Sequence, residues 1–201
     1  MKLLLGTRNP GKLAELKALL EDVPSLCLAT YAEQPFALVE ETGTTFVENA
    51  RLKARSIAAQ TGLAVLAEDA GLEVDALDRA PGVRSARFSG EPVDHSRNNA
   101  LLLDRLQGRT DRLARFVAVA CLHFPDGMEI LKEGVLEGRI AESPAGEEGF
   151  GYDPLFIPSG DDRTLAEMSR EEKNRISHRR RAIEQVKEAL AAFAAGVSQT
   201  G

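Results

Sequence analysis

The chain has 201 residues, enough for one sizeable domain, or for one domain built from two lobes, with a core that needs no disulfide staples. Its 43% hydrophobic and 28% charged residues are ordinary for a folded protein and exclude a disordered chain. The net charge of −6 disfavours a dedicated nucleic-acid binder, and no apolar run approaches the roughly 20 residues that cross a bilayer. Cys27 and Cys121 are too few for a disulfide framework, so we expect reduced thiols and a cytoplasmic protein.

The first half of the chain alternates short apolar runs with helical patterns. We predict a buried strand at residues 3–5, then a helix that begins at Pro10 with Asn9 as its cap. A second helix is predicted at residues 46–59, because Thr45-Phe46-Val47-Glu48 matches a capping box. Residues 63–67 are predicted as a short strand, residues 68–71 as a break, and residues 72–77 as a second, half-buried strand.

The second half contains one long hairpin among helices. We predict a helix at residues 98–107, a strand at 113–124, a turn at 125–127 and a partner strand at 128–140. A glycine-rich loop follows at residues 147–152, then a capping box at Ser169, a last helix striped by Ile183, Val186 and Leu190, and a frayed tail at 194–201. Interleaved helices and strands with one hairpin predict an α/β fold with a mixed sheet, in a single domain spanning residues 1–201.

The segment Gly6-Thr7-Arg8-Asn9-Pro10-Gly11-Lys12 lies between the first strand and the first helix. The N-terminus of a helix offers unpaired N–H groups and a positive dipole end, so an anion can bind there. Lys12 and Arg8 would add full positive charges. A capped helix with solvated basic side chains is the alternative interpretation of the same pattern.

Acidic residues gather in two places. Glu40 and Glu41 precede Thr42-Gly43, and Glu68 and Asp69 follow a predicted buried strand, where the ligands of a sheet typically gather. Magnesium prefers carboxylates together with water and phosphate oxygens, so acids from two loops would suit it. Solvated acids in turns are the alternative.

Two further segments carry candidate binding residues. In Gly149-Phe150-Gly151-Tyr152-Asp153-Pro154, the glycines allow a close backbone approach and the aromatic rings can stack on a base or sugar. The run at residues 173–181 is the densest basic stretch of the chain and could bind phosphate or a purine carbonyl. The alternatives are an aromatic turn that packs on the core and a solvated helix face.

Taken in order, these segments resemble the inosine triphosphate pyrophosphatase family, which hydrolyses non-standard purine nucleoside triphosphates such as ITP, dITP and XTP to the monophosphate and pyrophosphate. The matching stretches are residues 7–12, 41–50, 67–77, 81–88, 149–154 and 176–179. No single motif is decisive, but six in one order, through nearly the whole chain, are very specific. The resemblance implies a cytoplasmic homodimer with no membrane or nucleic-acid partner. Each subunit would have an elongated mixed sheet flanked by helices and a nucleotide cleft between two lobes.

The resemblance also implies roles for particular residues. Asp69 would be the general base or the acid that anchors Mg²⁺, with Glu41 as the other magnesium ligand and Glu40 as a less favoured stand-in. The triphosphate would be bound by Thr7, Arg8, Asn9, Pro10, Gly11 and Lys12, with Lys53 also reaching the phosphates. Base and sugar would be held by Phe150, Gly151, Tyr152, Asp153, Lys173, His178 and Arg179.

The chain departs from the family pattern at three of these positions. Glu68 and Ala70 stand where the family usually has Asp and Ser, and Arg8 stands where a small or polar residue is more usual. The change to Ala70, at a substrate-binding position, removes a hydroxyl from the neighbourhood of substrate or metal. The departures at Glu68 and Ala70 leave Asp69 itself in place, and Asp69 remains the predicted catalytic residue.

Three rival functions are weighed against this one. A Maf-type pyrophosphatase for pyrimidine or modified nucleotides is the nearest, and the His178-Arg179 pair favours the purine function over it. A nucleic-acid-binding module using residues 173–181 would bind with a steep salt dependence, but it leaves the acids near Asp69 unexplained. A catalytically weak nucleotide sensor is the third, suggested by Ala70.

Overall fold

The computed structural model describes residues 1–24 and 26–197, and the side chains as far as residue 191. Four elements come first: β1 (Lys2–Leu5), α1 (Pro10–Leu20), β2 (Cys27–Ala29) and α2 (Phe46–Thr61). The Asn9 side chain accepts a hydrogen bond from the Lys12 amide at the start of α1, and Thr45 and Glu48 form a reciprocal capping box at the start of α2. Both predicted helix starts are confirmed.

The predicted break after residue 67 is wrong, because β3 (Ala64–Val74) runs through it without interruption. Glu68 and Asp69 therefore lie in the middle of a strand and not at its end. A strand tolerates two consecutive buried carboxylates only where cations neutralise them, and the chain supplies those cations from distant helices. Only residues 75–77 of the second predicted strand leave β3, as a short 3₁₀ turn.

The remaining strands are β4 (Leu113–His123), β5 (Glu129–Ile140) and β6 (Phe156–Pro158), and the remaining helices are α3 (His95–Arg105), α4 (Arg170–Ile176) and α5 (His178–Val197). α3 begins three residues before its predicted start because Asp94 caps it. The predicted tail at residues 194–201 is wrong as far as Val197, where alanine-rich sequence continues α5. Residues 198–201 lie outside the described part of the chain.

The six strands form one sheet in the order β2-β1-β3-β4-β5-β6. β1 pairs in parallel with both β2 and β3, and β5 pairs antiparallel with β6. The predicted α/β class with a mixed sheet flanked by helices is confirmed. The nucleotide cleft between two lobes stays a prediction.

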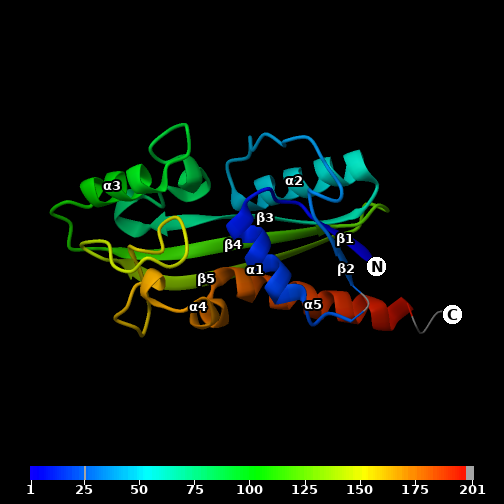
Figure 1. Cartoon of the computed structure of the whole chain (residues 1–201). Helices are drawn as coiled ribbons and strands as arrows, with labels where there is room; N and C mark the ends of the chain where they lie inside the picture. Colours follow the sequence, from blue (N-terminus) through cyan, green and yellow to red (C-terminus); the bar gives the residue numbers. More distant parts are fainter. Residues whose placement is uncertain (25, 198–201) are drawn as a thin grey trace. The chain divides into compact units, whose positions relative to one another are not determined.

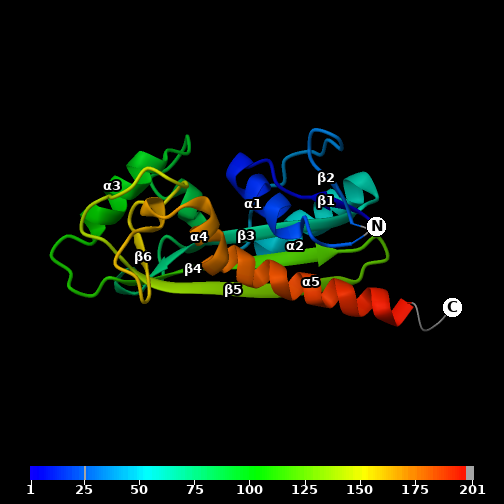
Figure 2. The ribbon, with the colours of Figure 1, turned by 60° about the horizontal axis from the view of Figure 1, so that its bottom comes forward.

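The chain divides into two compact units. Unit 1 contains residues 1–69, residues 118–134 and the last helix from Arg179 onward. Within it, α2 covers one face of the strands, and α1 and α5 lie on the other (Figure 1). α5 lies along the first part of β5 (Figure 2), where the Gln185 side chain donates to the Glu133 carbonyl at 2.7 Å.

Unit 2 contains residues 70–117 and 135–178. Its core is a cluster of buried apolar side chains from β3, α3, β4, β5 and the loops around β6, among them Leu72, Leu102, Phe116 and Phe156. The rings of Phe116 and Phe156 pack with their centroids 4.6 Å apart. Residues 149–153 and Lys173 belong to this unit, so most of the predicted base-binding residues lie in one unit, and Tyr152 is part of its core.

Candidate active site

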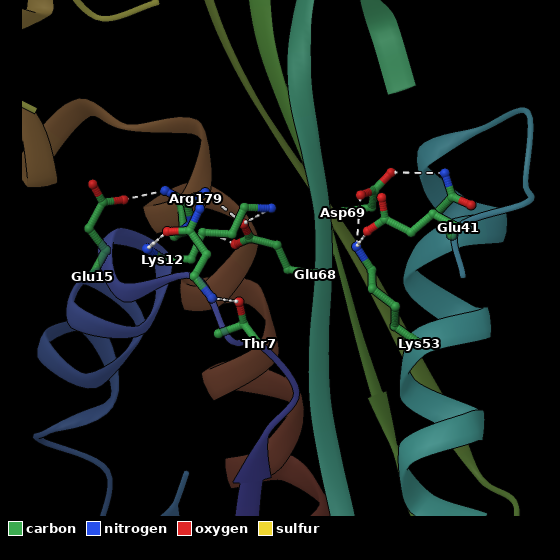
Figure 3. Close-up of polar contacts among 10 residues, drawn as sticks. Thr7, Lys12, Glu15, Glu41, Lys53, Glu68, Asp69 and Arg179 are labelled. Carbon is green, nitrogen blue, oxygen red and sulfur yellow. Dashed lines mark hydrogen bonds and ion pairs between the residues drawn. The ribbon is translucent and has the colours of Figure 1, made fainter. Parts of the chain in front are cut away.

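Two consecutive carboxylates in the middle of β3 organise unit 1. Glu68 and Asp69 are both buried, with 5% of each residue exposed. Because successive side chains of a strand point to opposite faces, Glu68 extends towards α1 and α5, whereas Asp69 extends towards α2 (Figure 3). Each carboxylate belongs to its own cluster of charged groups.

On the Asp69 face, one ammonium group is shared by two carboxylates. Lys53 Nζ lies 2.8 Å from Asp69 Oδ1 and 2.5 Å from Glu41 Oε1. The Asn49 side-chain amide donates to Asp69 Oδ2 at 3.2 Å. Asn49 and Lys53 are four residues apart on α2, so a single face of that helix holds the Asp69 carboxylate. We call Glu41, Lys53 and Asp69 the shared-lysine cluster.

The loop before α2 places Glu41 in this cluster. The Gly43 amide donates to Asn49 Oδ1 at 2.8 Å, and the Thr44 amide donates to Glu48 Oε2 at 2.7 Å. A Cβ atom on Gly43 would lie 2.6 Å from Asn49 Oδ1 and 2.7 Å from Glu48 Cβ, so only glycine fits there. The Thr42-Gly43-Thr44-Thr45 sequence thus ties the Glu41 loop tightly to the first turn of α2.

Burial and neighbouring charges shift the pKa values of the carboxyl and ammonium groups in the shared-lysine cluster. Burial raises the pKa of the Asp69 carboxyl, and the charges of Lys53 and Lys12 offset only part of that rise. Burial alone would lower the pKa of Lys53, but Asp69 and Glu41 outweigh it and raise the pKa of its ammonium. The Lys53 ammonium is attracted by two carboxylates, whereas the Asp69 carboxylate is attracted by Lys53 and Lys12 and also repelled by Glu41. The lysine is therefore charged, and its ammonium lies between two carboxylates.

On the Glu68 face of β3, two carboxylates contact two cationic side chains. The Arg179 guanidinium donates two hydrogen bonds to the Glu68 carboxylate, both at 2.6 Å, and another to Glu15. Lys12 Nζ lies 3.3 Å from Glu68 Oε1. Burial would lower the pKa of Arg179, but Glu68 and Glu15 outweigh it and raise that pKa. Two carboxylates thus face two cations, and we call these four residues the paired-arginine cluster.

The turn between β1 and α1 is ordered by its own side chains. The Asn9 amide donates to Thr7 Oγ1, and the Lys12 amide donates to Asn9 Oδ1, both at 3.1 Å. The Lys12 side chain leaves this turn towards Glu68 (Figure 3). Burial lowers the pKa of the Lys12 ammonium, and the attraction of Glu68 does not restore it, because Lys53 and Arg179 are also positive. A helix N-terminus with a buried lysine beside it is suited to bind an anion.

In unit 2, the Phe150 loop is built around one carboxylate. Asp153 Oδ2 accepts from the Phe150 amide at 2.8 Å and from Lys173 Nζ at 2.6 Å. The Lys173 ammonium lies 4.9 Å from the centroid of the Phe150 ring. The Asn99 side chain donates to the Gly151 carbonyl at 3.1 Å. These bonds hold a half-buried aromatic ring beside a buried lysine, an arrangement suited to stack on a flat, electron-rich base.

His178 and Arg179 are neighbours in sequence but have different surroundings. The His178 ring stacks on Phe116 in unit 2, with centroids 4.9 Å apart and an interplanar angle of 12°. Arg179 contacts Glu68 and Glu15 in unit 1. Both side chains are buried, as is Lys173, so this part of the basic run is not a solvated helix face. Ser177, in an extended conformation, separates α4 from α5 and breaks the run.

A sequence model of the Ham1 family matches residues 3–189. The chain belongs to the Ham1 family. It is 50% identical to the dITP/XTP pyrophosphatase of Exiguobacterium sp. over 98% of this chain and 100% of that protein, and 51% identical to the dITP/XTP pyrophosphatase of Elusimicrobium minutum over 92% and 98%. Among solved structures it resembles a Ham1 protein from Coxiella burnetii, with a TM-score of 0.89, 41% identity and coverage of 96% of this chain and 99% of that one. It also resembles the Staphylococcus aureus Ham1 protein, with a TM-score of 0.87, 39% identity and coverage of 96% and 100%.

Within unit 1 of this Ham1 chain, the structure brings several predicted residues together. Glu41, Lys53 and Asp69 are in direct contact, and Lys12 lies near enough to influence the pKa of Asp69. Glu40 is exposed and has no hydrogen bond or ion pair among the described residues, so Glu41 is the acid that meets Lys53. Ala70, half-buried, follows Asp69 directly on β3.

Two residues that contact the predicted site residues were not themselves predicted from the sequence. Glu15 binds Arg179, and Asn49 binds Asp69. The sequence could have indicated Asn49, because it stands one helical turn before Lys53 and therefore lies on the same face of α2. The sequence could not have indicated Glu15, because an acidic residue on an amphipathic helix is typical of a solvated face.

Among the described residues, no group of three or more His, Cys, Asp or Glu side chains is arranged to hold a metal ion. Glu41 and Asp69 supply two carboxylates to one cation position. Two protein carboxylates are typical of Mg²⁺ sites, in which the ion retains water molecules and takes its other oxygen ligands from phosphates.

Proposed function

We propose that this chain hydrolyses non-standard purine nucleoside triphosphates, among them ITP, dITP and XTP, to the monophosphate and pyrophosphate. The observation that carries the proposal is the shared-lysine cluster, in which two carboxylates converge on one ammonium group. Two converging carboxylates, largely buried, form an environment that a divalent cation would stabilise. The names of the relatives, dITP/XTP pyrophosphatases, supply the substrate class.

The residues of the cluster fit a magnesium ion held by Glu41 and Asp69. Their oxygens already converge on a single cation, the Lys53 ammonium, at 2.5 and 2.8 Å. When bound, Mg²⁺ would neutralise charge on the phosphates and on the leaving pyrophosphate. Lys53 would turn its ammonium towards the phosphate oxygens and keep its positive charge in the site.

The hydrolytic step uses the chain's own groups as follows. A water oxygen attacks the α-phosphorus, and the bond from that phosphorus to the bridging oxygen of pyrophosphate breaks. Asp69 accepts the proton that the water loses. Thr7, Asn9, the backbone of Pro10 and Gly11 and the Lys12 ammonium bind the triphosphate, at the N-terminus of α1.

For recognition of the base, we propose that Phe150 stacks on the purine ring in unit 2, with Lys173 held in place by Asp153. Gly151 and Tyr152 shape the loop, and the Tyr152 hydroxyl donates to the Ser85 carbonyl at 2.9 Å. Inosine and xanthosine present a carbonyl at the purine six-position, whereas adenosine presents an amine. Donors such as His178 would therefore prefer the first two, since adenine leaves a buried donor unpaired at a cost of about 1–3 kcal/mol.

The Arg179 guanidinium forms ion pairs with Glu68 and Glu15. We propose that its contribution to nucleotide binding is indirect, because it shares the Glu68 carboxylate with Lys12 and so fixes where that carboxylate lies.

Pyrophosphate release measured with ITP, dITP and XTP in the presence of Mg²⁺ tests the proposal. We expect turnover of all three, far slower turnover of ATP, and loss of activity when a chelator removes the metal. Release of orthophosphate in place of pyrophosphate would contradict the assigned bond cleavage. Absence of turnover with every purine triphosphate would instead favour the weak sensor, and a preference for modified pyrimidines the Maf-type function.

The nucleic-acid-binding alternative loses support from burial. Its proposed surface, residues 173–181, contains the buried side chains of Lys173, His178 and Arg179, two of which are bound in ion pairs. Within the described residues, no helix combines the length and the apolar character that crossing a membrane needs. The homodimer and the cytoplasmic location remain proposals, and light scattering on the purified protein tests the former.

A further inference from the structure

Arg8, one of the departures from the family pattern, has an unexpected set of contacts. Its guanidinium carbon lies 4.1 Å from the centroid of the Tyr31 ring and 5.5 Å from that of Phe36. Arg8 Nη2 donates a hydrogen bond to the Phe36 carbonyl. The two rings meet edge to face with centroids 5.2 Å apart. A guanidinium stacked on one ring and bonded to the backbone of the next is fixed in place by the loop that follows β2.

That loop leads directly to the shared-lysine cluster. After Phe36, which is buried, the Ala37 amide donates to the Gln60 side chain at 2.6 Å, and the chain then continues through exposed Leu38 to Glu41. The Glu41 side chain is 27% exposed, the most open member of its cluster. The anchor at Gly43 lies on the other side of Glu41. Glu41 thus lies between two fixed points of the chain, residues 36–37 on one side and Gly43 on the other. Arg8 helps to fix the first of these points through its hydrogen bond to the Phe36 carbonyl.

We propose that Arg8 is a positioning residue that couples the phosphate-binding turn to the Glu41 loop. It holds residues 31–41 against the turn that contains Thr7 and Asn9, so that Glu41 meets Lys53 before any nucleotide binds. We call the contacts of Arg8 with Tyr31 and Phe36 the clamp. Only its effect on metal binding and turnover rests on the proposed function, because the clamp itself is a property of the folded chain. The rival role, a direct contact from Arg8 to phosphate, would make Tyr31 irrelevant.

The first experiment needs no activity. Hydrogen–deuterium exchange of peptides covering residues 31–41 is compared in metal-free and nucleotide-free protein for Arg8→Ala, Tyr31→Leu and Tyr31→Phe. We expect about two- to fivefold faster exchange in the first two, and wild-type exchange in Tyr31→Phe, which retains the ring. Lys132→Ala, which removes a positive charge from β5, is the control and leaves these peptides unchanged. Wild-type exchange in Arg8→Ala would overturn the clamp.

The second experiment asks whether the clamp serves the Glu41 site. The Mg²⁺ concentration for half-maximal pyrophosphate release is measured for Arg8→Ala, Tyr31→Leu and the double variant. We expect a rise of about two- to fivefold in each single variant and no further rise in the double variant, because one interaction is lost in all three. A higher KM for the triphosphate in Arg8→Ala, with Tyr31→Leu unaffected, would overturn the proposal in favour of direct phosphate contact. If wild-type protein releases no pyrophosphate, the proposed function fails while the exchange experiment still decides the clamp.

Discussion

The two faces of β3 carry the same kinds of residue with different charge balances. In the paired-arginine cluster, Glu15 and Glu68 face Lys12 and Arg179, so negative and positive charges are equal. In the shared-lysine cluster, the carboxylates of Glu41 and Asp69 both contact the ammonium of Lys53. Neighbouring positions of one strand thus belong to two separate clusters, and in one of them a single ammonium lies between two carboxylates (Figure 3).

Exposure differs most clearly between individual members of the two clusters. The side chains of Glu68 and Arg179 are 2% and 3% exposed, whereas that of Glu41 is 27% exposed. Lys12, at 19%, is the open member of the paired-arginine cluster, and Asp69, at 7%, is the least exposed member of the other. Removing one partner of the enclosed Glu68–Arg179 pair would leave a buried charge unpaired, which favours a structural role for that pair. Two converging carboxylates, of which that of Glu41 is the more open, are suited to bind a further cation. We therefore propose that the Asp69 face performs the chemistry and that the Glu68 face supports it.

The largest effect is expected from Asp69→Asn, which keeps the shape of the side chain and removes its ability to accept a proton and hold a metal. Turnover of dITP should fall by about 10³-fold or more. Circular dichroism should be unchanged, since burial already opposes the charge on Asp69. Pyrophosphate release near the wild-type rate would show that the wrong carboxylate has been assigned.

Next in size is the effect of Arg179→Met on stability. The variant leaves Glu15 and Glu68 buried without their principal partner, which should reduce the free energy of unfolding by about 3–5 kcal/mol. Urea unfolding followed by circular dichroism measures this, with the half-exposed Arg180→Met as the control. A loss below about 1 kcal/mol would mean that the network is not structural.

Glu41→Gln should act on the metal and not on the fold. We expect the Mg²⁺ concentration for half-maximal activity to rise by about 10- to 100-fold, because one of two carboxylate ligands becomes neutral. Glu40→Gln is the matched control and should leave that concentration unchanged. Equal effects of the two variants would return Glu40 to consideration as the ligand.

The smallest of these effects is expected from Lys12→Ala. Triphosphate binding should weaken by about tenfold, the loss of one charged hydrogen bond, and monophosphate binding should weaken less. Isothermal titration with both ligands measures the difference. Equal losses for the two would contradict the assignment of Lys12 to the phosphate chain.

Local signals in the sequence predicted the parts of the fold that local chemistry decides. Asn9 and Thr45 satisfy backbone amides of their own helices, so their caps can be recognised without any knowledge of tertiary structure. The sequence predicts a break at residues 68–71, whereas β3 continues through them. The partner cations of Glu68 and Asp69 come from residues 12, 53 and 179, and no local pattern contains that information.

The contacts of the predicted site residues also depend on tertiary structure. The resemblance to a family implied roles for the acids and the lysines, for Arg179 at the base and for Arg8 at phosphate, and these roles stay predictions. In the structure Arg179 binds two acids, and Arg8 stacks on Tyr31. Both outcomes depend on which side chain lies across the fold, a distance of 111 residues along the chain for Arg179 and Glu68.

The most direct test of the functional division compares Glu68→Gln with Asp69→Asn in the same two assays, pyrophosphate release from dITP and urea unfolding. We expect opposite profiles: Glu68→Gln retains turnover within about tenfold and loses about 1–3 kcal/mol of stability, while Asp69→Asn loses turnover and retains stability. Loss of turnover in Glu68→Gln with unchanged stability would contradict this division and would place the chemistry on the other face of β3.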